Sequence, residues 1–143
     1  MKIKRLGQDL SDAHAVRRTV FVEEQGFSQA GEFDEKDADA IHFAGYIDNR
    51  PVATGRIVNE GNGRCSLGRI CVLKEVRETG QGRQLMRYLI DAAKKEGFQT
   101  IIVRAQVRVS GFYEKMGFVK TGEEFYEEHV AHVKMILEPN RSR

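Results

Sequence analysis

Two kinds of hydrophobic spacing alternate along this chain. Short apolar runs typical of strands occupy residues 2–6, 41–47, 52–58, 67–73, 100–103, 118–119 and 130–137. Apolar residues at helical spacing fill three other stretches, from residue 9 or 11 to about 25, from 80 to 97, and from about 109 to 116. Asp9 or Ser11 is suited to cap the first of these helices. Gly26, Gly97 and Gly117 follow the three stretches, as glycine often does at helix ends.

The connections between these elements predict the fold. Residues 48–51 and 60–63 are tight turns between neighbouring strands, whereas a polar loop is expected from residue 26 to residue 39. The helix at 80–97 crosses over between the strands at 67–73 and 100–103, so these two strands should be parallel. The predicted fold class is α/β (α+β), with a mixed sheet of six or seven strands and helices on both faces. A ligand is expected at the carboxyl end of the strand at 67–73, where the parallel strands can part.

Composition narrows the class of protein. A chain of 143 residues with 41% hydrophobic and 31% charged residues is typical of one soluble globular domain, here residues 1–143. No apolar run has membrane-spanning length, and the segment from Met1 to Arg5 lacks the apolar core of an export signal. Cys65 and Cys71 are expected on one strand, roughly 20 Å apart, which excludes a disulfide between them. These features favour a cytoplasmic protein.

The positions of the charged residues are more informative about binding partners than the net charge. A net charge of +2 gives no argument for nucleic-acid binding. Seven acidic residues face a single base, Lys36, in the stretch from residue 23 to residue 39. The acids are Glu23, Glu24, Glu32, Asp34, Glu35, Asp37 and Asp39. An acidic rim could attract a cationic amine, although a solvated loop is the simpler explanation for most of these acids.

The connection between the strand at 67–73 and the following helix is the most informative stretch. Its glycines and the helix N-terminus would direct several unpaired N–H groups and a partial positive charge at one point, a geometry that binds phosphate or pyrophosphate. A Walker loop is excluded because Gly82 is followed by Arg83 and Gln84. A dinucleotide fingerprint is excluded because Leu85 stands where its third glycine belongs. A plain glycine-rich helix entry remains an alternative.

Two motifs resemble those of the GNAT N-acetyltransferases. Residues 77–82, Arg-Glu-Thr-Gly-Gln-Gly, resemble the acetyl-CoA loop of that family, and Phe112-Tyr113 followed by Gly117-Phe118 resembles its second hallmark. Further segments resemble the ElaA-like and YjcF-like bacterial branch. They are Val22-x-Glu24-Gln25, Asp34-Glu35-x-Asp37, Arg69-Ile70-x-Val72, Ala105-Gln106 and Val130-Ala131-His132-Val133-x-Met135. Residues 128–132 read Glu-His-Val-Ala-His, where the branch usually has Gly-Ile-Pro-His before the last strand.

The resemblance implies a GNAT fold with splayed central parallel strands and acetyl-CoA as cofactor. Backbone N–H groups of residues 77–82 would hold the pyrophosphate, the Val72 N–H would receive the thioester oxygen, and Tyr113 would donate to the leaving sulfur. Arg77 and Arg83 are the expected side-chain partners of the phosphates. The full set of expected cofactor contacts is Ile70, Cys71, Val72, Arg77, Glu78, Thr79, Gly80, Gln81, Gly82, Arg83, Gln106 and Phe112.

Removal of the amine proton calls for a base, and the candidates are Glu24, Glu23 and His132. A lysine-like amine at neutral pH lies roughly 4.6 kcal/mol from its free base, and an α-amine about 1.4 kcal/mol. Histidine has a suitable pKa for this work, but a lone histidine in an apolar strand is more often a core residue. Arg69 and Gln106, polar residues in predicted strands, either connect the sheet or line the cleft. The sequence shows no cluster of metal-ligand residues.

These inferences predict an acetyl-CoA-dependent N-acetyltransferase that acts by direct attack of a primary amine. The expected acceptor is a small molecule of the amino-sugar, polyamine or amino-acid type, with no nucleic-acid or membrane partner. Two alternatives remain, a non-catalytic acyl-CoA-binding module and an acetyltransferase for a protein or peptide amine. An exposed last strand could also pair across a homodimer.

Overall fold

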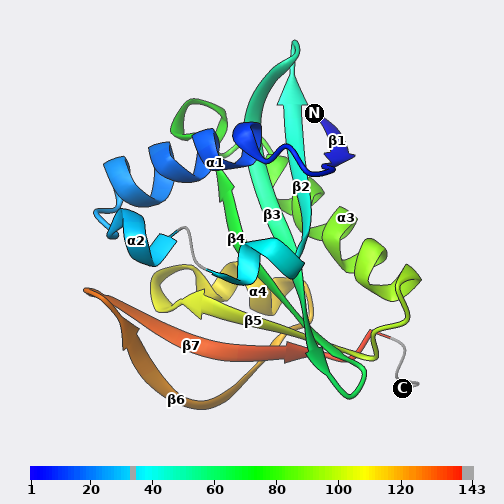
Figure 1. The fold of residues 1–143 in the computed structure, drawn as a ribbon. Coiled ribbons are helices and arrows are strands. Elements are labelled where there is room, and N and C mark those ends of the chain that lie inside the picture. Colours follow the sequence, from blue (N-terminus) through cyan, green and yellow to red (C-terminus); the bar gives the residue numbers. More distant parts are fainter. Residues whose placement is uncertain (33–34, 140–143) are drawn as a thin grey trace.

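The structure, a computed structural model, describes residues 1–32 and 35–139. A seven-stranded sheet with the order β1-β2-β3-β4-β5-β7-β6 runs through the molecule (Figure 1). The strands are β1 (Lys2–Arg5), β2 (Ile41–Ile47), β3 (Arg50–Gly61), β4 (Arg64–Val72), β5 (Thr100–Gln106), β6 (Val119–Glu127) and β7 (Val130–Leu137). All neighbouring pairs are antiparallel except β4 and β5, whose parallel pairing confirms the predicted crossover.

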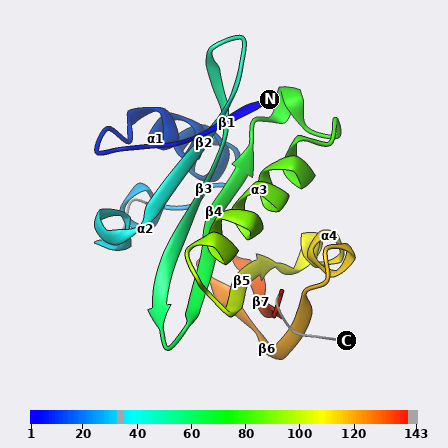
Figure 2. The same ribbon diagram turned by 90° about the vertical axis from the view of Figure 1, so that its right-hand side faces the viewer.

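Helices cover both faces of this sheet. The helical segments are α1 (Ser11–Arg17), η1 (Arg18–Glu24), α2 (Gln29–Glu32), η2 (Glu35–Asp39), η3 (Lys74–Val76), α3 (Gln81–Lys95), η4 (Val107–Val109) and α4 (Ser110–Lys115). Figure 2 shows the sheet between α1 and α2 on one side and α3 on the other. On the α3 side, Gly55 allows close packing, since a Cβ atom there would lie 2.7 Å from Leu89 Cδ1.

The hydrophobic core follows the spacing in the sequence. In α3, the residues at helical intervals, Leu85, Met86 and Leu89, are fully buried against the sheet. Val16 and Val20 do the same from the opposite face, in α1 and η1. These two layers hold the sheet between them and keep its central strands in place.

The central strands separate where the ligand was expected. Pairing between β4 and β5 runs only from Arg64 opposite Thr100 to Leu67 opposite Val103, so residues 68–72 and 104–106 continue without pairing with one another. A β-bulge lies at the point of separation. Thr54 pairs with Cys71 and Arg56 with Gly68, so an advance of two residues along β3 is matched by three along β4. Arg69, within the longer segment, has a φ of 50°. A bulge bends its strand, and here it bends β4 just beyond its last pair with β5.

Several sequence predictions need correction. The first helix changes to a π-helix at Arg18, because each turn from there includes one extra residue, and its N-cap is Leu10 instead of Asp9 or Ser11. Asp9 nevertheless accepts the Ser11 N–H through Oδ1 at 3.0 Å. The expected polar loop contains α2 and η2. Strand β4 begins three residues before the predicted start at Leu67.

The last strand is not an exposed edge, so the basis for pairing it across a homodimer is wrong. β7 lies between β5 and β6, and the edge strands are β1 and β6. Cys65 and Cys71 are both buried and form no disulfide, as predicted. Among the described helices, none combines the length and the apolar character that crossing a bilayer requires. Asp34, from the acidic stretch, lies outside the described residues.

Candidate functional site

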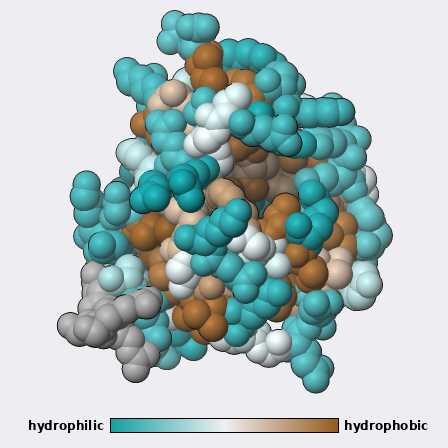
Figure 3. Space-filling model, turned by 180° about the vertical axis from the view of Figure 1, so that it is seen from behind, coloured by the Kyte–Doolittle hydropathy of each residue, from teal (hydrophilic) through white to brown (hydrophobic). Residues whose placement is uncertain are grey.

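A cleft of about 510 Å³ opens where β4 and β5 separate. The unpaired ends of both strands line it together with η1, α4 and the turn between β6 and β7. Seen from behind, the surface is hollowed near its centre, with hydrophobic residues in the hollow and hydrophilic residues around it (Figure 3). Seven of the predicted site residues share the cleft. They are Ile70, Cys71, Val72, Arg77, Gln106, Tyr113 and His132.

The loop before α3 keeps its backbone donors available. The N–H groups of Val76 and Arg77 bond to Leu73 and Lys74, but no carbonyl or side chain of the described residues accepts an N–H from residues 78–83. Glu78 and Gly80, with φ values of 67° and 83°, turn the chain into the helix. Six consecutive N–H groups at a helix N-terminus form a site for an anion such as pyrophosphate. Residues 78–83 and Phe112 lie outside the lining of the cleft, and a Cβ atom on Gly82 would lie 3.8 Å from the Phe112 ring.

The end of β4 presents another backbone donor. The Leu73 N–H bonds to the Val52 carbonyl on β3 at 2.8 Å. Because successive peptide groups of a strand point to opposite sides, the Val72 N–H points away from β3, toward the gap. The Val72 carbonyl is oriented in the same way, since it accepts a hydrogen bond from Arg77 Nε at 2.9 Å. This geometry fits the predicted role of the Val72 N–H in binding a thioester oxygen.

Tyr113 reaches the cleft from α4 with its ring packed edge-on against Phe112 and Phe118, at centroid distances of 5.2 and 5.9 Å. Its side chain is buried, and burial together with the nearby Cys71 thiol raises the pKa of Tyr113 to about 12. Its hydroxyl has no hydrogen-bond partner among the described residues. The Tyr113 side chain is therefore a neutral phenol whose hydroxyl can donate a hydrogen bond to a ligand in the cleft.

Arg77 and Glu24 bind each other, an arrangement that the sequence analysis did not foresee. Both terminal nitrogens of Arg77 lie 2.6 Å from the two carboxylate oxygens of Glu24. The hydrogen bond from Arg77 lowers the pKa of Glu24. The pairing disfavours Glu24 as a base, because a carboxylate held ionised by an arginine has little tendency to take a proton. The ion pair also disfavours Arg77 as a phosphate ligand. It connects the end of η1 to the loop before α3.

His132 is better placed to act as a base. Its Nδ1 lies 2.9 Å from the Val130 carbonyl oxygen, which can only accept, so Nδ1 carries the proton and Nε2 is free to take one. Nε2 lies 3.8 Å from a carboxylate oxygen of Glu127. The ring is stacked on Phe125 and contacts Phe27 edge-on. His132 is thus a buried side chain on the wall of the cleft with a fixed tautomer.

Hydrogen bonds join two distant segments that both line the cleft. The turn between β6 and β7 reaches residues 25–28, where the Glu128 carboxylate accepts the Ser28 N–H and hydroxyl at 2.9 and 3.0 Å. His129 Nε2 donates to the Gln25 carbonyl at 2.7 Å. Gln106 binds the Gln25 side chain at 2.8 Å, so it both connects two elements and lines the cleft.

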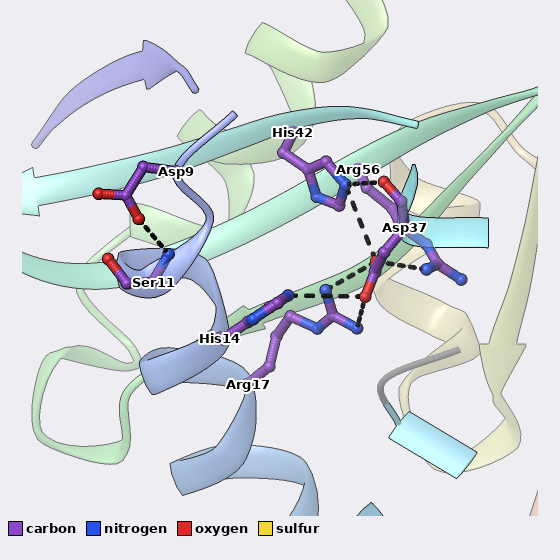
Figure 4. Close-up of polar contacts among 7 residues, drawn as sticks. All are labelled: Asp9, Ser11, His14, Arg17, Asp37, His42 and Arg56. Atoms are coloured by element: carbon purple, nitrogen blue, oxygen red, sulfur yellow. Dashed lines mark hydrogen bonds and ion pairs between the residues drawn. The ribbon is translucent and has the colours of Figure 1, made fainter. Parts of the chain in front are cut away.

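A buried charge cluster lies beside the cleft and was also missed. Asp37 binds Arg17 at 2.9 and 3.1 Å and Arg56 at 2.7 Å, with His14 and His42 close by (Figure 4). Burial favours a higher pKa for Asp37, but the hydrogen bonds and charges of the two arginines lower it. Asp37 is therefore a structural carboxylate rather than part of an acidic rim. The signal that was overlooked is Arg56 in an otherwise apolar strand segment.

The cleft also contains hydrophobic residues that the sequence analysis did not single out as site residues. Val20 and Phe21 of η1, and Phe27 beyond it, face the opening. A π-helix is frequent at functional sites, but its start could not be read from the sequence. No group of three His, Cys, Asp or Glu side chains within residues 1–32 and 35–139 is arranged to hold a metal ion.

Comparison with known proteins shows the family to which this chain belongs. The family model described as "Acetyltransferase (GNAT) domain" matches residues 8–139. The N-acetyltransferase YjcF of Bacillus subtilis, described as uncharacterized, is 37% identical over 131 residues, 90% of this chain and 92% of that protein. The crystal structure of Escherichia coli ElaA has a TM-score of 0.84 at 24% identity and covers 94% of this chain and 97% of its own. A GNAT family acetyltransferase from Elizabethkingia anophelis, solved with acetyl-CoA bound, has a TM-score of 0.78 at 14% identity and covers 96% and 97%. The chain belongs to the GNAT acetyltransferase family.

Proposed function

We propose that this protein is an acetyl-CoA-dependent N-acetyltransferase that acts on the primary amine of a small molecule. One observation carries the proposal: a loop whose six N–H groups find no acceptor among the described residues precedes α3, next to the gap between the parallel strands. Such a loop binds the diphosphate of a coenzyme, and the gap accommodates the arm that leads to the thioester. The Elizabethkingia anophelis neighbour of the same fold holds acetyl-CoA, and this supports the choice of cofactor.

The reaction follows from the groups around the gap. The diphosphate binds the N–H groups of residues 78–83, and the thioester carbonyl accepts a hydrogen bond from the Val72 N–H. The neutral amine attacks the carbonyl carbon to form a C–N bond and an oxyanion, which the Val72 N–H stabilises. The C–S bond then breaks, and Tyr113 donates a hydrogen bond to the departing thiolate. The proton lost by the amine goes to His132 Nε2, directly or through a water molecule.

Two alternatives are less well supported. A non-catalytic binding module has no use for a buried phenol whose hydroxyl is without a partner among the described residues, as that of Tyr113 is. A protein or peptide acceptor would need an open approach, whereas hydrogen bonds of Glu128 and His129 with residues 25–28 join two segments that line the cleft. We also propose a cytoplasmic location, which is consistent with two cysteines that form no disulfide.

The proposal is tested by measuring thiol release from acetyl-CoA with a panel of amino sugars, polyamines, amino acids and peptides. Acetyl-CoA affinity is measured in parallel by calorimetry for the native protein and for Gly82→Asp, which adds bulk and negative charge beside the predicted diphosphate site. We expect turnover of a small amine and no binding by Gly82→Asp. The control is Gly7→Asp, because an added Cβ at Gly7 meets nothing within 4 Å.

The possible failures of this test are distinct. Binding of acetyl-CoA without turnover of any panel member would support the non-catalytic module. Unchanged affinity of Gly82→Asp would place the cofactor elsewhere.

A further inference from the structure

Glu127, at the end of β6, is a carboxylate of the cleft lining that forms no hydrogen bond with any described residue. The other carboxylate in the lining, Glu128, is bound by Ser28. Three arginines of the lining are paired with carboxylates from elsewhere in the chain. The pairs are Arg56 with Asp37, Arg77 with Glu24 and Arg104 with Glu60. Within the described residues, no ion pair joins Glu127 to a lysine or an arginine.

Glu127 faces the ring nitrogen of His132 that can take up a proton. Oε2 of Glu127 lies 3.8 Å from Nε2 of His132, which is longer than a hydrogen bond. Nδ1 of the same ring donates to the Val130 carbonyl, so Nε2 of the neutral ring is an acceptor, as is the carboxylate. The His132 side chain keeps 6% of its surface exposed, and Nε2 itself is not fully buried. Two acceptors therefore face each other where a ligand in the cleft can reach both.

An ammonium group fits between these two acceptors. A nitrogen about 2.8 Å from both atoms, which are 3.8 Å apart, would see them roughly 85° apart, so two tetrahedral N–H bonds would each be bent by only about 12°. A buried polar atom such as His132 Nε2 normally has a hydrogen-bond partner. A water molecule would also supply two donors, but only a cation matches the charge of the Glu127 carboxylate.

The hairpin of β6 and β7 places this acceptor pair beside the gap between the central strands. Phe125 pairs with His132, and its ring stacks on the imidazole. Glu127 lies two residues further along β6, so its side chain is on the same face as that of Phe125. On its other side β7 pairs with β5, and His132 lies opposite Gln106 in the part of β5 that continues beyond its last pair with β4. The two acceptors thus lie level with the open part of the gap.

We propose that the acceptor amine enters the cleft as its ammonium ion and is bound between the Glu127 carboxylate and His132 Nε2. This inference rests on the proposed N-acetyltransferase function and names the form of acceptor that the site selects. That form is a protonated aliphatic amine, in preference to a weakly basic nitrogen nucleophile that is neutral at the same pH. One N–H of the ammonium points to Glu127 and another to His132.

Each proton that the bound ammonium loses has a destination in the reaction. Nε2 of His132 takes the first proton, and the imidazolium that forms lies beside the Glu127 carboxylate. The freed electron pair on the amine nitrogen forms the C–N bond with the thioester carbon, and the C–S bond then breaks. A second proton passes from this nitrogen to the departing thiolate, which leaves as the thiol of coenzyme A. His132 returns its proton to solvent.

Calorimetry tests the charge of the bound amine by counting the protons released on binding. The probe is the amine with the highest kcat/KM in the thiol-release panel. It is titrated into the protein with coenzyme A bound, in buffers that differ in ionisation enthalpy. The pH is set roughly two units below the pKa of the amine, where almost all of it is protonated. Binding of the free base would release about one proton per amine, whereas binding of the ammonium releases none, which is the result we expect.

The variant Glu127→Gln removes the charge and keeps the shape of the side chain. We expect KM for the amine to rise roughly 10- to 100-fold, the range for loss of a charge-assisted hydrogen bond, with acetyl-CoA affinity unchanged. Glu127→Asp keeps the carboxylate and should recover part of this loss, which a merely structural role would not predict. The control is Glu124→Gln, because Glu124 is an exposed residue of the same strand outside the cleft lining.

The outcomes separate this inference from the proposed function. Release of about one proton per amine by the native protein would overturn the inference and leave the acetyltransferase function standing. An unchanged KM in Glu127→Gln, or an equal rise in Glu124→Gln, would overturn the role of Glu127. Tight acetyl-CoA binding without thiol release by any amine would contradict the proposed function, and the inference with it. The proton count uses the native protein, so it decides the question even where Glu127→Gln does not fold.

Discussion

Replacement of Tyr113 by phenylalanine tests the chemistry most directly. The change removes one oxygen atom from a buried ring that lines the cleft and leaves its packing on Phe112 and Phe118 intact. The hydroxyl has no partner within the described part of the chain, so its removal leaves no other group unsatisfied. Thermal stability should accordingly stay within about 2 °C of that of the native protein.

The expected loss of rate follows from the acidity of the phenol. The pKa of Tyr113 is raised to about 12, whereas an ordinary thiol titrates near about 8.5. Full proton transfer from Tyr113 to the thiolate would be uphill by about 5 kcal/mol, at about 1.4 kcal/mol per pKa unit. Tyr113 therefore acts as a hydrogen-bond donor to a charged sulfur, a contact worth about 1.5–3 kcal/mol. Its loss should lower kcat roughly 10- to 100-fold.

The assay is thiol release under saturating acetyl-CoA, with affinity measured separately by calorimetry. Affinity for acetyl-CoA should be almost unchanged, because the charge on sulfur develops only as the C–S bond breaks. Tyr126→Phe is the matched control, since Tyr126 is 73% exposed on the edge strand β6. An unchanged kcat in Tyr113→Phe, or a large loss of cofactor affinity, would refute the role assigned to the hydroxyl.

Three further predictions concern charged and thiol groups. Glu24→Gln should leave the acidic limb of the pH–rate profile unchanged, because Arg77 lowers the pKa of Glu24 and disfavours it as the base. The same change should lower the free energy of unfolding by less than about 1 kcal/mol. A shift of that limb would restore Glu24 as a base. A maleimide should alkylate Cys71, which lines the cleft, and not Cys65, which is fully buried with its pKa raised to about 12. Coenzyme A should protect Cys71 from this reaction. Peptide mass mapping measures the labelling of both cysteines, and faster labelling of Cys65 than of Cys71 would contradict the prediction. Asp37→Asn should lower the free energy of unfolding by about 3–5 kcal/mol near neutral pH by leaving two arginines without their carboxylate. Because the folded-state pKa of Asp37 is lowered, its contribution is fully present above about pH 4 and is lost as the pH falls through the folded-state pKa. Urea unfolding of both proteins should therefore converge in acid, and a difference independent of pH would contradict the argument.

Local patterns in the sequence were enough for most of the fold. The strands Ile41–Ile47 and Val130–Leu137 have the predicted bounds, and β4 and β5 are parallel as the crossover required. These features depend on the spacing of neighbouring side chains and on the steric limits of short connections. The glycine-rich turn into α3, where we propose that the diphosphate binds, was predicted for the same reason, since it is formed by consecutive residues and by the start of a helix.

Predictions that needed a partner distant in the sequence were less successful. Glu24 and Arg77 are 53 residues apart, and each was assigned a role that their mutual ion pair disfavours. Asp37 was placed on a solvated loop, but η2 brings it between Arg17 and Arg56. No periodicity indicates which of several carboxylates an arginine meets once the helices pack on the sheet.

By itself the sequence determined the order of the strands and main helices along the chain, the parallel central pair and the glycine-rich turn before α3. Each of these is set by residues close together in the chain. Tertiary structure alone decided where β4 leaves β5, which tautomer His132 adopts and which carboxylates bind Arg17, Arg56 and Arg77. The physical reason is that ion pairs, burial and the bulge at Arg69 arise from contacts between separate elements, whose geometry exists only after the two helical layers have packed on the sheet.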